Sequence, residues 1–131
     1  MNRTTLLLSA AVMLAGGPAA FAQGLHVSQH LAGYQCMSLN LSEQQLLTNS
    51  APVPVRSGPS PTSPQVGVAG STVAVAAPLQ PVNGFYKMLF PNGATVWIEA
   101  AKLRPWANSS NPKATCTPSM MSNGKPGFDY R

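Results

Sequence analysis

The chain has 131 residues, and only 8% of them are charged, with eight basic against three acidic side chains. The basic residues are scattered and form no run of lysine or arginine, which argues against a nucleic-acid-binding stripe. Because a solvated monomer surface normally carries about a quarter or more charged residues, much of this surface must consist of small polar and apolar side chains. Such a surface is suited to burial against other proteins.

The first 22 residues have the pattern of an export signal. A single positive charge precedes an apolar stretch at 6–15 that is too short to span a bilayer, and Ala20-Phe21-Ala22 fits the small-x-small cleavage rule. We therefore expect residues 1–22 to be a signal peptide cut after Ala22; the alternative is an uncleaved membrane anchor. No later apolar run approaches the roughly 20 residues of a membrane span. We expect the mature protein in the periplasm, associated with a membrane only through its partners.

The mature chain is long enough for one domain and contains two cysteines, Cys36 and Cys116. An exported chain with two cysteines in an oxidising compartment usually pairs them. Since the pair brackets most of the domain, we predict an internal disulfide. Two free thiols, or one cysteine joined to a partner subunit, are the alternatives.

Residues 23–50 form a lead-in, which is predicted to be extended or mobile up to Gly33 and to contain a short helix after that. Ser42 followed by Gln45 has the spacing of a capping box, a pattern typical of helix starts. The helix is expected to lay an apolar side on the rest of the domain, made of Leu39, Leu41, Leu46 and Leu47.

Residues 51–106 alternate in the manner of short strands separated by turn residues. Asn83-Gly84 and Asn92-Gly93 supply turn signals, and residues 99–103 resemble a short helical turn. The Pro-rich stretch at 51–64 leaves a disordered linker as the alternative there. The spacing predicts a small barrel or sandwich, with strands at 53–56, 65–69, 72–76, 85–90 and 95–98. Residues 107–131 are predicted to be a polar tail.

The order of these segments resembles the bacterial SH3-like domain family. The resemblance covers about half of the mature chain and is carried by the segments 54–60, 64–68, 70–75, 83–88 and 92–98. The chain departs from the family pattern at Phe85, where tryptophan is common, and at Val96, where glycine is usual. The resemblance implies a small SH3-like β-barrel, so we expect a mainly β fold with a short helix, extended terminal segments and one disulfide.

Aromatic side chains are the candidates for recognition, because they are enriched in interface cores. Tyr86, Trp106 and Tyr130 are the predicted partner-binding residues. Phe85 and Trp97 are assigned to the barrel core, Trp97 because of its place in the closing strand.

The sequence lacks the spacing of common catalytic and cofactor motifs. It has no Gly-x-Ser-x-Gly elbow, no Cys-x-x-Cys-His haem site and no Gly-rich phosphate loop. His26 and His30 are spaced to share a metal on a helical face, but no third ligand has an evident spacing. We expect this chain to have no catalytic activity by itself, no metal and no cofactor.

Exported chains of this size with one disulfide and one SH3-like barrel resemble the small third subunit of membrane-bound quinohaemoprotein alcohol dehydrogenases. In those complexes the large subunit carries pyrroloquinoline quinone, a multihaem cytochrome c passes electrons to ubiquinone, and the small subunit supports the assembly. The resemblance implies a non-catalytic accessory subunit that contacts a quinoprotein dehydrogenase and a multihaem cytochrome c. The alternatives are a cell-wall or peptide-binding SH3-type module and a periplasmic inhibitor or stress protein that docks onto an enzyme cleft.

Overall fold

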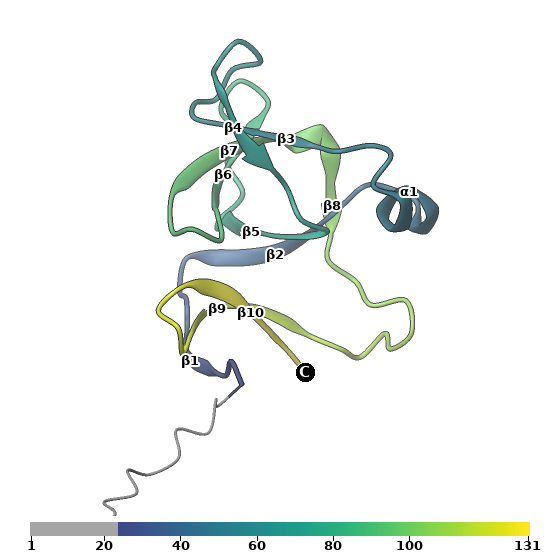
Figure 1. The fold of residues 1–131 in the computed structure, drawn as a ribbon, viewed down its shortest axis with the longest axis vertical. Coiled ribbons are helices and arrows are strands. Elements are labelled where there is room, and N and C mark those ends of the chain that lie inside the picture. The colour runs from purple at the N-terminus through teal and green to yellow at the C-terminus, as the bar shows by residue number, and fades with distance from the viewer. Residues whose placement is uncertain (1–23) are drawn as a thin grey trace, which may run out of the picture.

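The computed structural model describes residues 24–131, so the predicted signal peptide at 1–22 lies outside the described part of the chain. The described residues form ten strands, one α-helix and one short 3-10 helix, arranged in two sheets (Figure 1). The expectation of a mainly β fold with a short helix and one disulfide is confirmed.

The larger sheet has seven strands in the order β4-β3-β7-β6-β5-β2-β8, and every neighbouring pair is antiparallel. Strands β3 to β7 coincide with the predicted strands to within one residue at either end. The predicted helical turn is the 3-10 helix η1 (Ala100–Lys102). The strands of this sheet are β2 (Tyr34–Leu39), β3 (Pro54–Arg56), β4 (Gln65–Val68), β5 (Thr72–Ala76), β6 (Phe85–Leu89), β7 (Thr95–Glu99) and β8 (Leu103–Pro105).

The seven-stranded sheet curls around its core but remains open (Figure 1). β4 pairs only with β3, and β8 pairs only with β2. No pairing joins these two edges within residues 24–131, so the sheet is not closed by hydrogen bonds there.

The core of this sheet comes from side chains that point to its inner face. In β7, Val96 and Ile98 are buried while their neighbours along the strand are not, which is the period of two expected of a strand with one covered face. Burial of each such side chain contributes about 1.5–3 kcal/mol. The buried cluster consists of Met37, Leu39, Val53, Val55, Val73, Val75, Met88, Val96, Ile98 and Leu103.

The smaller sheet joins the two ends of the described chain. β1 (Val27–His30) and β10 (Pro126–Tyr130) both pair antiparallel with β9 (Cys116–Met121), which lies between them. Within the predicted tail at 107–131, residues 116–121 and 126–130 form β9 and β10. In the lead-in, residues 27–30 are extended and pair with β9. β9 pairs on both sides and so satisfies backbone groups of both neighbouring strands.

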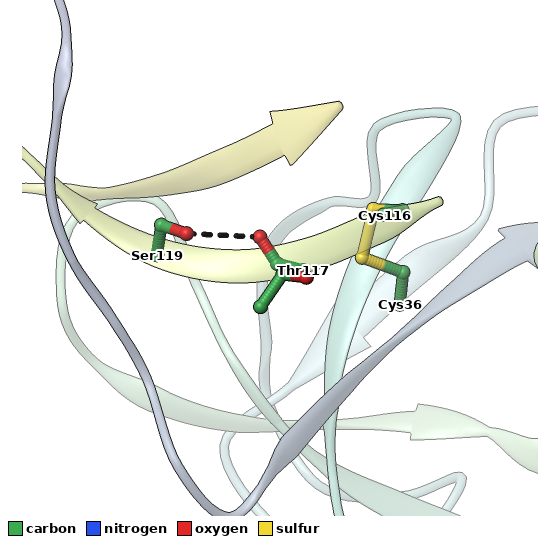
Figure 2. Close-up of a disulfide and its surroundings, with 4 residues drawn as sticks. All are labelled: Cys36, Cys116, Thr117 and Ser119. Atoms are coloured by element: carbon green, nitrogen blue, oxygen red, sulfur yellow. Dashed lines mark hydrogen bonds between the residues drawn. A yellow bond between two sulfur atoms is a disulfide. The ribbon is translucent and has the colours of Figure 1, made fainter. Parts of the chain in front are cut away.

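The predicted disulfide is confirmed, and it links the two sheets (Figure 2). Cys36 lies on β2 and Cys116 on β9, with their Cα atoms 6.0 Å apart. Ser119, two residues beyond Thr117 on β9, is fully buried, and its hydroxyl donates a hydrogen bond to the Thr117 carbonyl at 3.0 Å. The buried polar group is thus satisfied on its own strand.

The helix α1 (Glu43–Thr48) begins at the predicted capping box. The Ser42 hydroxyl accepts a hydrogen bond from the Gln45 N–H at 3.1 Å, and the Gln45 side-chain oxygen accepts one from the Ser42 N–H at 2.9 Å. Leu41 and Leu46 pack against the core, as expected, but Leu47 is 79% exposed. Consecutive residues on a helix point about 100° apart. Because Leu46 points toward the core, the adjacent Leu47 points away from it.

Candidate protein-binding surfaces

Trp106 and Tyr130, two of the three predicted partner-binding residues, lie against each other. Trp106 follows β8, and Tyr130 is the last residue of β10. Their rings stack with centroids 5.9 Å apart and an interplanar angle of 26°. Phe128 lies two positions earlier on the same face of β10, and its ring centroid is 5.9 Å from that of Tyr130. We call these three residues the aromatic row.

A shallow hollow lies beside the aromatic row, between Trp106, Tyr130 and the loop that follows Trp106. The side-chain oxygen of Asn108 fixes this loop by accepting hydrogen bonds from the N–H groups of Ser110 and Asn111, at 2.9 and 3.1 Å. No charged side chain lines the hollow among the described residues. A protein partner could therefore cover it without removing a charge from water, which is the most costly form of burial.

Tyr86, the third predicted residue, belongs to a different surface. It lies opposite Ile98 in the β6–β7 pairing and packs against the core. Its outer side lines a groove of about 240 Å³ together with Pro78, Val82 and Trp97. The structure therefore divides the predicted site residues between two surfaces.

The assignment of Trp97 to the core is wrong, whereas Phe85 is buried as expected. Val96 and Ile98 take the inner positions of β7, so Trp97 between them must project from the outer face. There the Lys87 ammonium lies 5.7 Å from the centre of the Trp97 ring, within the range of a cation–π interaction. The alternation of β7 in the sequence was the signal that could have placed Trp97 outside.

The smaller sheet carries a carboxylate on β10 that is bound by a residue of the opposite edge strand and by the residue that follows β10. His30 on β1 shares a hydrogen bond of 2.8 Å between its Nε2 and the Asp129 carboxylate on β10, and Arg131 Nε donates one at 3.0 Å. The hydrogen bond with His30 is the main cause that lowers the pKa of Asp129 below its ordinary value of 3.8. Desolvation is the next largest effect and opposes this shift, and the hydrogen bond and charge of Arg131 lower the pKa by smaller amounts. This contact therefore connects β1 to β10 across β9.

The low pKa of Asp129 predicts that its contribution to stability depends on pH. A carboxyl whose pKa is lower in the folded state stabilises the fold above its unfolded pKa, and this contribution is lost as the pH falls through the folded pKa. Asp129→Asn should thus be less stable than the wild type at about pH 7, and the difference should disappear in acid. Urea unfolding midpoints of both proteins across this range measure the effect.

Glu43→Gln is the control for that experiment, because Glu43 makes no ion pair within the described residues. Its unfolding midpoint should follow that of the wild type more closely at every pH. A constant gap between Asp129→Asn and the wild type from neutral pH to acid would contradict the assigned role of the carboxylate.

The histidines do not form the considered metal site. His30 lies on a strand rather than on a helical face, and its ring contacts Asp129. Within residues 24–131, no three His, Cys, Asp or Glu side chains are close enough to hold a metal ion.

In the same part of the chain, no helix is long and apolar enough to cross a membrane. Comparison of the chain with protein-family models, curated proteins and solved structures gives no match.

Proposed function

We propose that this protein is a non-catalytic accessory subunit of a periplasmic, membrane-associated enzyme complex. The complex that agrees best with the sequence resemblance is a quinohaemoprotein alcohol dehydrogenase of an ethanol-oxidising respiratory chain. Its partners are then a quinoprotein dehydrogenase and a multihaem cytochrome c, and the protein itself belongs to the SH3-like family. The disulfide is compatible with an oxidising compartment of this kind.

The aromatic row is the observation that carries this proposal. Tyr130 is 56% exposed although its ring stacks with that of Trp106, so a large flat surface is presented to the outside. Aromatic side chains dominate the binding energy of many protein interfaces, and the adjoining hollow has no charged lining. Both features favour docking against another protein.

Such a subunit would act by binding only the assembled form of its partner, which raises the population of that form. The aromatic row is suited to this because it spans two parts of the fold: Trp106 follows a strand of the larger sheet, whereas Tyr130 belongs to the smaller one. The disulfide fixes these sheets to each other. A surface that is already ordered loses less entropy on binding.

Purification of the tagged protein from native membranes in mild detergent, followed by an absorption spectrum, tests the proposal. We expect stoichiometric haem and a dehydrogenase-sized subunit to purify with it. Trp106→Ala combined with Tyr130→Ala should reduce recovery of these partners by about tenfold or more, as expected for interface hot spots. Trp106→Phe combined with Tyr130→Phe keeps the rings and should retain most of the recovery.

Thermal melting of both double variants checks that any loss comes from the surface and not from unfolding. A wild-type protein that elutes alone and without haem absorption would contradict the accessory-subunit function. If that protein were then retained on purified wall material, and Tyr86→Ala abolished the retention, the cell-wall alternative would replace it.

A further inference from the structure

The outer face of the larger sheet carries a row of one aromatic and two basic side chains. The register places Arg56 on β3 directly opposite Trp97 on β7, and Trp97 directly opposite Lys87 on β6. Directly opposed residues in antiparallel strands project from the same face. Trp97 therefore lies between the residues Arg56 and Lys87 on this face, and the Lys87 ammonium approaches the ring centre to 5.7 Å. We call these three residues the cationic row.

The two cations of this row have no carboxylate partner within residues 24–131. Among the lysines and arginines of that part of the chain, Arg131 alone makes an ion pair with an acidic side chain. The Arg56 guanidinium donates one hydrogen bond to the Ser63 carbonyl at 3.1 Å, which orients the group without neutralising it. Lys102 and Glu99 line a hollow beside Arg56, so the surroundings add one positive and one negative charge. The face as a whole is positive.

Apolar side chains border the cationic row on the side of β6. The groove of about 240 Å³ there is lined by Pro78, Val82, Tyr86 and Trp97, with Lys87 also on its wall. Val82 is 44% exposed. Ligand sites commonly combine an apolar lining with a few polar groups that fix orientation. This groove offers an aromatic and aliphatic surface next to an ammonium group.

The geometry points to an extended acidic protein segment as the ligand of the cationic row. We infer that its carboxylates pair with Arg56 and Lys87, and that an apolar side chain between them covers Trp97 and enters the groove. Arg56 and Lys87 lie on the two strands that flank β7, and neighbouring strands are about 4.8 Å apart. The two cations thus suit carboxylates about 10 Å apart. Positions i and i+3 of a segment in the extended polyproline II conformation lie on one face at about this spacing.

This inference rests on the proposed function, because it names the chemistry that a partner subunit presents to the larger sheet. It concerns a surface separate from the aromatic row, so the two can be tested independently. Charge attraction of this kind is expected to accelerate association and to weaken as salt is added.

A fluorescence titration tests the cationic row directly. In Trp106→Phe, Trp97 is the only remaining tryptophan, so its emission reports on this face. The probe is a peptide with glutamate at every third position, separated by leucine and serine, and the control peptide has glutamine in place of glutamate. We expect saturable binding of the glutamate peptide and binding of the glutamine peptide weaker by about tenfold.

Further variants of Trp106→Phe separate the contribution of the cationic row to peptide binding from that of the general positive charge of the protein. Arg56→Gln combined with Lys87→Gln should weaken binding of the glutamate peptide by about five- to tenfold, the range expected for two partly exposed ion pairs. Lys113→Gln combined with Lys125→Gln removes the same charge elsewhere and should change the affinity less than about twofold. A thermal melt of each variant excludes unfolding.

Equal binding of the two peptides, equal losses in the two double variants, or no saturable binding of the glutamate peptide would each overturn the inference. Copurification of haem and a dehydrogenase subunit with the wild-type protein would leave the accessory function standing in that case. Specific peptide binding by a protein that purifies alone would support the acidic-segment site and contradict the accessory function.

Discussion

Replacing Cys36 and Cys116 together by alanine is expected to lower the free energy of unfolding by about 4–5 kcal/mol. The two cysteines are 80 residues apart in sequence, and a cross-link that closes a loop of this length removes much of the entropy of the unfolded chain. For a domain of this size, such a loss lowers the melting temperature by about 15–30 °C. Thermal and urea unfolding of the wild type and the double variant measure it.

Reduction of the wild type supplies an independent comparison for this experiment. A reductant should bring the wild-type unfolding midpoint close to that of the double variant, and it should leave the variant itself unchanged. Coincident midpoints of the oxidised wild type and the variant would contradict a stabilising role of the disulfide. The aromatic row depends on the same disulfide, because Trp106 follows β8 of the larger sheet whereas Tyr130 ends β10 of the smaller sheet.

Ile98→Ala is expected to destabilise the fold by about 2–5 kcal/mol. The Ile98 side chain is fully buried at the centre of the core cluster. Its truncation removes apolar contacts and leaves a cavity that the curled sheet can only partly fill. Urea unfolding gives the change in free energy directly.

Val66→Ala is the matched control, since it shortens a β-branched apolar side chain that is 49% exposed on the edge strand β4. Surface substitutions of this kind usually stay within about 0.5 kcal/mol of the wild type. A loss for Ile98→Ala that is no larger than that for Val66→Ala would mean that the inner face of β7 is wrongly placed.

The strands β3 to β7 could be predicted from the sequence because each one alternates and is bounded by turn residues. The capping box at Ser42 was predictable because its two residues are close in sequence. The disulfide was predictable because the chain has only two cysteines. In each of these cases, the residues that determine the structure are close together in sequence or have no competitor. Local chemistry therefore sufficed for most of the larger sheet.

The smaller sheet was not predicted, although apolar and polar residues alternate at 116–120 in β9 and at 128–130 in β10. β9 contains Pro118, and a proline inside a strand argues against a central position in a sheet. Asn123-Gly124 did contain a hairpin signal: Gly124 has a positive φ of 77°, and the Met121 N–H bonds to the Lys125 carbonyl at 2.9 Å. However, β1, which pairs with β9, lies about ninety residues away in sequence, and no local pattern predicts that pairing.

The cationic row was not predictable either, because it depends on register between strands that are distant in sequence. Arg56 and Trp97 become neighbours only when β3 pairs with β7. The mistaken placement of Trp97 in the core had a different cause. Trp97 is assigned to the core in the sequence analysis because of its place in the closing strand, but the buried positions of that strand belong to Val96 and Ile98.

The central place of β9 in the smaller sheet determines the order in which the protein can fold. A chain is synthesised from its N-terminus, yet β1 has its sheet partner, and Cys36 its disulfide partner, on β9 at 116–121. A nascent chain that stops before residue 116 would hold an unpaired first strand and a reactive thiol. The larger sheet can assemble from strands made earlier, whereas the cross-link requires residue 116 and the smaller sheet requires the strands at 116–121 and 126–130.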